Sequence, residues 1–521
     1  MKRYAALYVL LCAAPAMGAA VFDITSYGAK GDGKAQNRDA INKAIDAASA
    51  AGGGTVIVPP GVWVSGSIRL RSHVTLQLER GAVLEASADA AAYDAPEPNQ
   101  WDKYQDFGHS HFHNSLIWGE GLEDIAIVGG GRISGKALNR GGGAGGDKAI
   151  ALKLCRNVTL RDISIFYAGH FGLLASGVDN LTVDNVAIDT NRDGIDIDSC
   201  RNVRIANSSI NAPNDDAITL KGTHTLGAAR VSENITIANC LVSGYEIGSL
   251  LDGTYKRTVE HAPDRDGPTG RIKIGTESEG DFRNITITNV VFDQSRGLAL
   301  ESVDGAHIED VTVSNISMRD VSNAPIFIRL GSRLRAPEGV AIGWIKRVSI
   351  SNLTAYNADP RYGSIISGIP GHDIEDVKLN NIRLVYRGGL SLDDAAKQPA
   401  DLVNSFFFRG GVPAREAYAT PEREKEYPEP SMFGILPAYG FFVRHASGIE
   451  LNDVRVAFLK DDRRPAFVLD TVDGVRFEDC RAQKAAGGAA TLVMMNVKRV
   501  RALGCEGLAD FDVAQAARKE M

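Results

Sequence analysis

Three aspartates in the middle of the chain are spaced so that a repeating fold could bring them together. Asp193 precedes Asp216 by 23 residues, and Asp215 stands next to Asp216. Carboxylates held close to one another repel, which raises the pKa of one and leaves another ionised. One protonated and one ionised carboxyl group are what the hydrolysis of a glycosidic bond requires. We therefore take these three as candidate catalytic residues, although each alone could also be an ordinary turn former.

Basic side chains fall beside these carboxylates in the same register. Arg192 aligns with Asp215, and His170 lies one repeat earlier in that column. Asp198 aligns with Lys221, and here we expect a surface ion pair that contributes little to stability. The elements that hold all these residues must then repeat about every 23 residues.

A nine-residue sequence motif forms that repeat. It reads NVTLRDISI from Asn157, NLTVDNVAI from Asn180 and NVRIANSSI from Asn202, and further copies run on to Arg499. Apolar and polar residues alternate within it, which indicates a β-strand, and the connections are too short for crossover helices. Strands at this spacing predict a solenoid whose coils stack as parallel sheets. The opening Asn suits a left-handed turn and a ladder of stacked side chains.

The predicted fold class is therefore all-β, a single parallel β-helix over residues 21–521. A sandwich or propeller fits less well, because propeller repeats are about 40 residues or longer. Residues 37–51 have the apolar spacing of a helix, and we expect this helix to cap the N-terminal end of the stack. Four longer segments are expected to be loop inserts that line one face: residues 93–115, 251–270, 331–343 and 386–439.

The composition is that of an ordinary globular chain. The 521 residues carry 57 Lys and Arg against 64 Asp and Glu, a formal net charge of −7, which argues against nucleic-acid binding. Residues 1–20 combine Lys2 and Arg3 with an apolar run and small residues, the pattern of a secretory signal peptide. No other apolar run is long enough to span a membrane. We therefore expect an exported protein, periplasmic or extracellular.

Five cysteines remain once such a signal is removed. Their odd number leaves at least one of them unpaired within the chain. Export would permit disulfides, but we expect most of these cysteines to be small buried residues of the stack. They are Cys155, Cys200, Cys240, Cys480 and Cys505.

The first insert holds a further group of polar and aromatic residues. His109, His111 and His113 alternate in it, and Trp101 precedes them. Three histidines at this spacing could bind a metal ion. We favour an exposed strand or a loop that contacts sugar, and we therefore predict neither a metal nor another cofactor.

With these residues in one register, the sequence resembles glycoside hydrolase family 28, the polygalacturonase family of right-handed parallel β-helices. Asn191-Arg192-Asp193-Gly194 is similar to the family's Asn-Thr-Asp-Gly motif, Asp215-Asp216 to its Asp-Asp motif, and Arg271-Ile272-Lys273 to its Arg-Ile-Lys motif. The segment from Asp23 to Gly33 is similar to the start of many pectin-acting β-helix enzymes. The three motifs occur in the family's order, which makes the resemblance specific.

The resemblance implies an inverting glycosidase that cleaves α-1,4-galacturonosyl linkages in a pectic polysaccharide or oligogalacturonide. Asp215 would protonate the glycosidic oxygen, while Asp193 and Asp216 would hold and deprotonate the attacking water. Arg271 and Lys273 would bind a galacturonate carboxylate, a group that guanidinium suits. Further candidates for substrate binding are Asn191, Arg192, His170 and Lys221.

Three departures from the family pattern put the sugar on the leaving-group side in question. Ser243 stands where the family has the His of a Gly-His-Gly motif, and Arg192 replaces the Thr of Asn-Thr-Asp. Asp304 lies near the position of a substrate-contacting Tyr. His170 could replace the missing His or be a structural turn residue. Rhamnogalacturonan or another pectic side chain therefore stays an alternative substrate.

The inserts bear on how a polymer would be cut. Residues 251–270 directly precede Arg271 and could close one end of a cleft, so we predict exo rather than endo action. Glu277 and Glu301 lie on strands near the site, either as contacts to hydroxyl groups or as surface residues. Two other functions stay open: a β-helix polysaccharide lyase, which leaves an unsaturated product, and a non-catalytic β-helix that binds carbohydrate without turnover.

Overall fold

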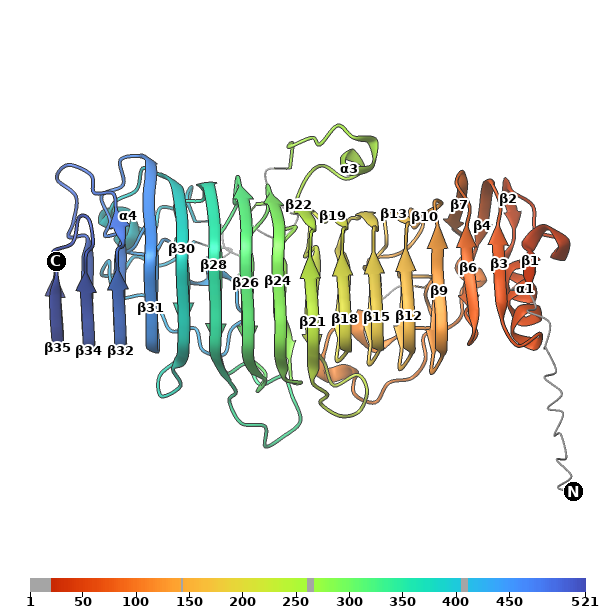
Figure 1. The fold of residues 1–521 in the computed structure, drawn as a ribbon, viewed down its shortest axis with the longest axis horizontal. Coiled ribbons are helices and arrows are strands. Elements are labelled where there is room, and N and C mark those ends of the chain that lie inside the picture. The colour runs from red at the N-terminus through yellow and green to blue at the C-terminus, as the bar shows by residue number, and fades with distance from the viewer. Residues whose placement is uncertain (1–19, 142–143, 260–266, 404–410) are drawn as a thin grey trace, which may run out of the picture.

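The computed structural model describes residues 20–141, 144–259, 267–403 and 411–521. The chain winds into a long stack of coils whose strands pair side by side from one coil to the next (Figure 1). The prediction of an all-β parallel β-helix is confirmed. The predicted signal peptide, residues 1–20, lies outside the described residues except for Ala20. No helix in the described part of the chain has the length and apolarity needed to span a bilayer.

Three ladders of parallel strands run along the stack, each named here after a central strand. The β17 ladder contains β5 (Ile68–Arg69), β8 (Ile117–Glu120), β11 (Lys148–Lys153), β14 (Phe171–Ser176), β17 (Asp193–Asp198), β20 (Ile218–Gly222), β23 (Ile272–Ser278), β25 (Leu298–Ser302), β27 (Ile326–Leu330) and β29 (Ser364–Ser367). The β18 ladder contains β1 (Val21–Asp23), β3 (Gly54–Val58), β6 (Val74–Leu78), β9 (Glu123–Gly129), β12 (Arg156–Arg161), β15 (Asp179–Asp184), β18 (Arg201–Ala206) and β21 (Ser232–Ala238). The β16 ladder contains β2 (Asp32–Gln36), β4 (Gly61–Ser65), β7 (Ala82–Ala86), β10 (Arg132–Ser134), β13 (Ser164–Phe166), β16 (Ala187–Asp189), β19 (Ser209–Asn211) and β22 (Leu241–Ser243).

In the C-terminal half the strands are longer and continue through the corners between ladders. β24 pairs with both β21 and β22, so it belongs to two ladders at once, and β31 pairs with both β29 and β30. The long strands and their short partner are β24 (Phe282–Asp293), β26 (His307–Arg319), β28 (Trp344–Ala358), β30 (Ile374–Gly388), β31 (Phe441–Lys460), β32 (Phe467–Glu478), β33 (Arg481–Ala482) and β34 (Leu492–Leu503). Alternate side chains of all three ladders point inward and form the continuous apolar core.

From Asn157 to Asn284, the corner that opens each repeat is built on stacked asparagines. Asn157, Asn180 and Asn202 have φ values of 56°, 57° and 56°, the left-handed region that Asn tolerates better than most residues. The side-chain amide of Asn180 donates to Asn157 Oδ1 at 2.9 Å, and that of Asn202 donates to Asn180 Oδ1 at 3.1 Å. The predicted asparagine ladder is confirmed.

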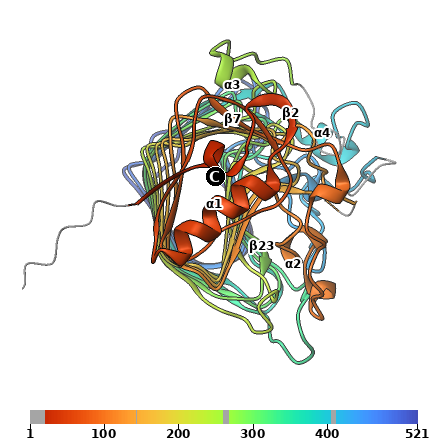
Figure 2. The same cartoon turned by 90° about the vertical axis from the view of Figure 1, so that its right-hand side faces the viewer.

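The two ends of the stack are closed in different ways. Helix α1 (Arg38–Ala50) lies across the N-terminal coil and buries Ile41 and Ile45 against it, as predicted (Figure 2). At the other end β35 (Phe511–Glu520) pairs antiparallel with β34, which the sequence did not predict. Charged residues at the end of β35, including Arg518 and Glu520, discourage a further strand from pairing with its open edge.

All five cysteines of the described chain are unpaired thiols in the structure, and four of them are buried. They stack among the apolar residues of the core. The expectation of small buried residues is therefore confirmed for Cys155, Cys200, Cys240 and Cys480, while Cys505 is partly exposed.

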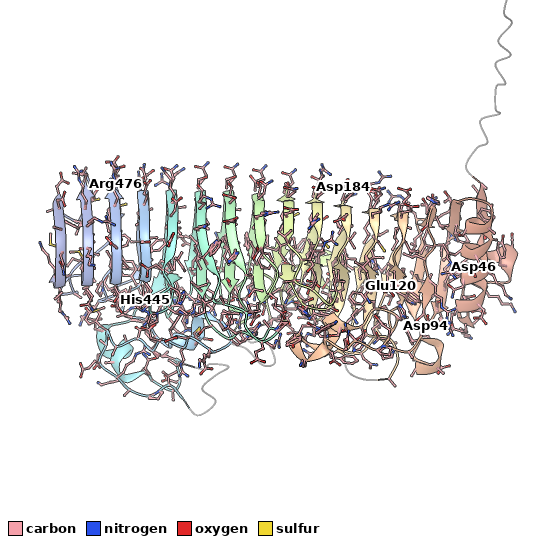
Figure 3. All side chains as sticks on the ribbon, turned by 90° about the horizontal axis from the view of Figure 1, so that it is seen from below. Asp46, Asp94, Glu120, Asp184, His445 and Arg476 are labelled. Carbon is pink, nitrogen blue, oxygen red and sulfur yellow. The ribbon has the colours of Figure 1, made fainter. Side chains whose placement is uncertain are left out.

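The loop inserts leave the stack mainly on one side. Seen from below, they project beyond the coils on the side towards Asp94, Glu120 and His445, whereas Asp184 and Arg476 lie along the regular opposite edge (Figure 3). The short helical segments besides α1 are η1 (Ile24–Tyr27), η2 (Ala90–Ala92), η3 (Asp102–Tyr104), α2 (Phe107–Ser110), α3 (Ser249–Asp252), α4 (Leu392–Lys397) and η4 (Pro430–Phe433). Most of them belong to the inserts.

Candidate active site

Polar side chains form a window on the outward face of the β17 ladder. One outward row runs from coil to coil through Leu174, Asp196, Thr219, Lys273 and Ala299. Its three polar members lie on the neighbouring strands β17, β20 and β23, between apolar residues on β14 and β25. We call this region, on β17, β20 and β23, the polar window.

The 93–115 insert closes the polar window on its N-terminal side. Phe112 of that insert forms an apolar cluster with Phe171 and Leu174 on β14. The ring of His109, on α2, also reaches over β17, where Nε2 lies 3.2 Å from Asp196 Oδ2. This insert thus covers the outward face of β14 and reaches β17.

The 386–439 insert closes the polar window on its C-terminal side. Met432 and Phe433, on η4, pack against Ala299 on β25 and Phe327 on β27. Together the two inserts wall the window at both ends along the stack. The wall was predicted for the 251–270 insert, of which residues 260–266 lie outside the described part of the chain; its last residue, Gly270, donates its backbone N–H to the carbonyl oxygen of Asp215 at 2.9 Å. Backbone N–H groups of Gly248 and Leu250 donate to Asp189 at the end of β16, which holds α3 over the turn before β17.

The three aspartates meet at the edge of the polar window, where β17 begins and in the turn before β20, as their register predicts. Asp193 opens β17, and the backbone N–H of Asp216 donates to its Oδ1 at 3.1 Å. One carboxylate oxygen from each of Asp193, Asp215 and Asp216 lies within 4.8 Å of those of the other two. All three are almost fully buried, with exposed fractions of 4%, 5% and 1%. Oxygens at that separation can both bond to one water molecule.

The protons in this cluster are not shared evenly. Burial, followed by the charges of Asp215 and Asp196, raises the pKa of Asp193 well above its ordinary value. Asp216 instead faces two cations, since Arg271 Nε lies 2.6 Å from Asp216 Oδ1 and Lys273 Nζ contacts Oδ2. The environment therefore favours a proton on Asp193 and a charge on Asp216.

Arg271 and Lys273 are buried cations held by protein carboxylates. Burial alone would lower their pKa values, but the charge of Asp216 raises both. Arg271 also places Nη2 3.4 Å from Glu429 Oε2, from the 386–439 insert. Both residues lie where the motif predicts, and in this structure both bind Asp216.

The prediction of a surface ion pair between Asp198 and Lys221 is wrong. Both residues are buried, because the inserts cover the outward face of the ladder. Lys221 Nζ binds Glu277 Oε2 at 2.8 Å, whereas Asp198 accepts hydrogen bonds from Ser176 and Thr223. Burial would raise the pKa of Glu277, but the charge of Lys221 lowers it well below its ordinary value.

Glu301 is part of the site and not a surface residue. It lies on β25, is fully buried, and accepts a hydrogen bond from Thr276 Oγ1 at 3.0 Å. Burial raises its pKa to about 7, while the nearby charges of Arg271 and Lys273 act in the opposite direction. Glu301 is thus a second carboxyl group able to carry a proton near neutral pH.

Arg192 and His170 take the places that the register predicts. Arg192 Nη2 lies 2.9 Å from Asp215 Oδ2. The ring of His170 stacks on Phe171, with centroids 4.1 Å apart, and burial together with Arg192 lowers its pKa well below the ordinary value. Asn191 contributes to the turn before β17, where its Oδ1 accepts from the backbone N–H of Ala168.

The three alternating histidines do not converge on one ion. His109 contacts Asp196, His111 Nδ1 lies 2.6 Å from the carbonyl oxygen of Glu97, and His113 Nε2 lies 2.8 Å from Glu120 Oε2. His109 and His111 are buried, so the exposed strand is wrong for them, while a loop that contacts sugar stays a prediction.

Two family models match parts of the chain. Residues 21–93 match the model described as rhamnogalacturonase A/epimerase, pectate lyase-like, and residues 108–259 match the right handed beta helix region. A probable polygalacturonase of Vitis vinifera is 29% identical over 318 residues, which are 57% of this chain and 60% of the relative. The chain is a homologue of the polygalacturonases. The predicted resemblance to glycoside hydrolase family 28 is thereby confirmed.

A second relative matches this polygalacturonase homologue more closely over a shorter stretch. The exo-poly-alpha-D-galacturonosidase of Dickeya chrysanthemi is 49% identical over 73 residues, 14% of this chain and 12% of that protein. The chain thus spans no more than about 60% of the length of these curated relatives.

The fold of the polygalacturonase homologue is also found among solved structures. The family 28 exopolygalacturonase of Yersinia enterocolitica superposes with a TM-score of 0.63 at 18% identity, over 88% of this chain and 78% of that chain. Together with the match to the right handed beta helix region, this confirms the predicted right-handed parallel β-helix.

Two departures of the polygalacturonase homologue from the family pattern are structural in this chain. Ser243 is buried and donates to Asn211 Oδ1 at 3.0 Å, so it is part of the β16 ladder's corner. Asp304 is buried and binds the guanidinium of Arg333 with Nε–Oδ1 at 2.9 Å.

The sequence reasoning missed several charged residues that come from the inserts. Arg335 binds Asp106 at 3.0 Å and also contacts Glu277, which joins the 331–343 and 93–115 inserts. Glu429 binds Arg296 at 2.7 Å beside its contact to Arg271. Their only sequence signal is their position in the predicted inserts, because these segments carry no repeat.

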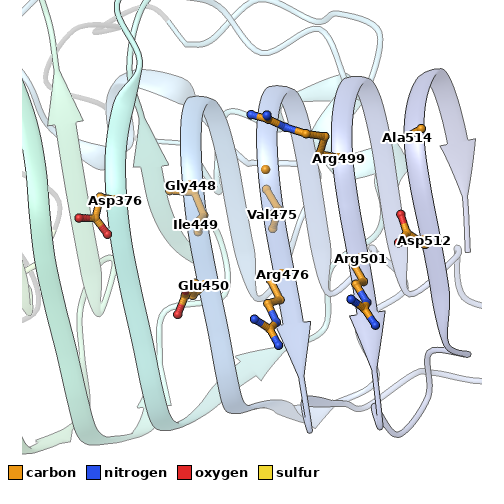
Figure 4. Close-up of a pocket in the computed structure, with 11 residues that line it drawn as sticks. Asp376, Gly448, Ile449, Glu450, Val475, Arg476, Arg499, Arg501, Asp512 and Ala514 are labelled. Atoms are coloured by element: carbon orange, nitrogen blue, oxygen red, sulfur yellow. The ribbon is translucent and has the colours of Figure 1, made fainter.

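A separate hollow of about 700 Å³ lies in the C-terminal coils of the polygalacturonase homologue (Figure 4). Its lining comes from β30, β31, β32, β34 and β35 and lies outside the polar window. Gly448 and Gly474 occupy the corner positions where earlier coils carry the asparagine ladder, and the missing side chains leave the hollow between Asp376 and Arg499.

Proposed function

We propose that this polygalacturonase homologue is an exported glycoside hydrolase that cleaves α-1,4-galacturonosyl linkages of pectin and acts from chain ends. The observation that carries the proposal is the meeting of Asp193, Asp215 and Asp216, with their nearest oxygens within 4.8 Å, beside the buried Arg271 and Lys273. Acid and base groups in one water-poor window are what hydrolysis of a glycosidic bond requires. The polygalacturonase relatives support this reaction class.

In the proposed reaction one carboxyl protonates the glycosidic oxygen and another removes a proton from the attacking water. The family resemblance gives the acid role to Asp215 and the water-binding role to Asp193 and Asp216. Asp216, held by two cations, suits the carboxylate that is ionised before the reaction and then accepts the proton of the water. The raised pKa of Asp193 makes that residue the competing candidate for the acid.

We propose inversion at the anomeric carbon. A pair of carboxyl groups that inverts with a water between them is separated by roughly 6.5–9.5 Å. The oxygens of this cluster are closer, within 4.8 Å, so one water bound by two carboxylates at once takes the place of a water between distant partners. The anomer of the first product, followed by NMR at early times, tests this step.

Exo action is proposed from the two walls of the polar window. A polymer lying along the ladder would meet Phe112 and His109 on one side and Met432 and Phe433 on the other. A window closed at both ends admits the end of a chain more easily than its middle. In this proposal the two walls are the 93–115 and 386–439 inserts.

Rhamnogalacturonan is the second candidate substrate. The match of residues 21–93 to a model described as rhamnogalacturonase A/epimerase, pectate lyase-like, favours it. The contacts of Arg271 with Asp216 and Glu429 also favour this substrate. A substrate carboxylate at Arg271 has to share the guanidinium with these two protein carboxylates.

The test is a time course of products from oligogalacturonides and from rhamnogalacturonan fragments, separated by chromatography. Release of monogalacturonate from the first time points, lost in Asp215→Asn and kept in Asp46→Asn, supports the proposal. Asp46 is an exposed residue on α1 and is a matched control. Mixed oligomers would mean endo action, and products from rhamnogalacturonan alone would select the second substrate.

The same experiment separates the remaining alternatives. A lyase leaves an unsaturated product that absorbs in the ultraviolet, whereas hydrolysis does not. Binding without any product from either polymer would mean a non-catalytic β-helix. Recovery of the protein from the periplasm or the medium, with residues 1–20 removed, tests the proposed export.

A further inference from the structure

Cys480 and Cys505 are neighbours on successive coils near the C-terminal end of the stack. Arg481, the residue after Cys480, forms a parallel bridge with Glu506, the residue after Cys505. The backbone N–H of Glu506 donates to the carbonyl oxygen of Cys480 at 2.8 Å. Paired strands lie about 4.8 Å apart, and disulfides join residues whose Cα atoms are about 4.4–6.8 Å apart.

The other three cysteines of the described chain have different neighbours. Val178 stands between Cys155 and Cys200, since Asp179 pairs with both Arg156 and Arg201. Cys240 is flanked by Ser208 and Val290 on the adjacent coils, because Leu241 pairs with Ser209 and Val291. These three thiols are built-in controls for any chemistry that the stacked pair undergoes.

The two stacked thiols differ in access and in acidity. Cys480 is 3% exposed, while Cys505 is partly exposed at the edge of the last coil. A hydrogen bond from Cys480 lowers the pKa of Cys505 to about 7, although burial acts in the opposite direction. A thiol of that acidity is substantially ionised near neutral pH and is the better nucleophile of the two.

We propose that Cys480 and Cys505 form a disulfide that staples the last coil to the one before it. The Cys505 thiolate attacks a disulfide of a thiol–disulfide oxidoreductase or of oxidised glutathione, which forms a mixed disulfide at Cys505 and releases one thiol. The sulfur of Cys480 then loses its proton and attacks the Cys505 sulfur, which releases the second thiol. Two protein thiols are oxidised, and one external disulfide is reduced to two thiols.

The disulfide would secure the end of the stack. The 24 residues between Cys480 and Cys505 include β34, the strand on which the antiparallel β35 rests. Coils in the middle of the stack have a partner on each side, whereas this end has only β35. Ends of repeat arrays open locally more readily than their centres, so a covalent link here raises the temperature at which the C-terminal coils separate.

The test scores each cysteine of the full protein separately. The protein is incubated with oxidised glutathione and divided into two samples, one of which is reduced. Both samples are then unfolded in the presence of N-ethylmaleimide and analysed by peptide mass mapping. We expect Cys155, Cys200 and Cys240 to be alkylated in both samples. Cys480 and Cys505 should be alkylated only after reduction, and the unreduced sample should contain their two peptides joined by a disulfide.

A second measurement ties the link to stability. Dithiothreitol should lower the unfolding midpoint of the oxidised wild type by several degrees and leave Cys505→Ser unchanged. Cys240→Ser, which keeps the stacked pair, should respond as the wild type does. Alkylation of Cys480 and Cys505 without reduction, or a disulfide from Cys505 to glutathione or to a second chain as the final product, would overturn the proposal. The mass map requires no variant, so it stands even if Cys505→Ser folds poorly.

Discussion

Arg192 Nη2 lies 2.9 Å from Asp215 Oδ2, across two neighbouring coils. The carboxyl group that the family resemblance selects as the proton donor is thus held by a cation that replaces the family's Thr. Asp193, one coil away, is the carboxyl group whose pKa is raised, through burial and the charges of Asp215 and Asp196. The assignment of the general acid therefore has to be made for this chain by experiment.

The first prediction concerns that acid. If Asp215 donates the proton, Asp215→Asn lowers kcat on oligogalacturonides by about 10²–10⁴-fold, the usual contribution of a general acid. The kcat of this variant should fall far less on an aryl galacturonide, because a good leaving group needs no protonation. Asp193→Asn is the matched variant and should lose activity on both substrates. The reverse pattern, with Asp193→Asn spared on the aryl substrate, would assign the acid to Asp193.

The second prediction concerns the C-terminal wall of the polar window. Phe433 is fully buried against Ala299 and Phe327, so Phe433→Ala should cost about 3–5 kcal/mol of stability and loosen η4. With that end open, we expect the products of oligogalacturonides to change from monogalacturonate to a mixture of oligomers, measured by chromatography.

Phe477→Ala is the control for this change. Phe477 is equally buried, but in the core of β32, away from the window. It should lower the unfolding midpoint to a similar extent and leave the product pattern unchanged. If Phe433→Ala still releases only monogalacturonate, the insert does not decide where the polymer is cut.

The repeat was enough to predict the part of the site that lies on the coils. A period of 23 residues places Asp193 beside Asp216 because successive coils are in register, and the structure has that pairing. The inserts have no period, so their contacts do not follow from spacing. Arg335 and Asp106 are 229 residues apart in sequence and form an ion pair. The register predicts the correct face of the ladder for Lys221. It does not predict that Lys221 is buried, because it says nothing of what covers that face.

The third prediction concerns the asparagine ladder. Asn180 has φ of 57°, donates to Asn157 and accepts from Asn202. Asn180→Ala loses both side-chain hydrogen bonds and puts an alanine into the left-handed region, which costs roughly 1–2 kcal/mol by itself. Asn180→Gly loses the same bonds without that strain. In urea unfolding we expect the midpoint of the alanine variant to fall below that of the glycine variant, and equal midpoints would contradict the role of the turn.

The fourth prediction concerns the pH dependence that Glu301 contributes. Burial raises its pKa from 4.5 to about 7 in the folded protein. Between these values the folded state binds more protons than the unfolded chain, so stability falls as pH rises through this window and the full cost is present above pH 7. A shift of this size corresponds to about 3 kcal/mol.

Glu301→Gln keeps the size of the side chain and removes its titration. Relative to the wild type, we therefore expect this variant to become more stable as the pH is raised from 5 to 8, measured as the difference in unfolding midpoint at each pH. Glu338→Gln, at an exposed position, reports how much such a change at the surface alters the midpoints by itself. A constant difference between Glu301→Gln and the wild type across this range would mean that Arg271 and Lys273 keep Glu301 ionised throughout, and the proton near Asp216 would then have to be sought on Asp193 alone.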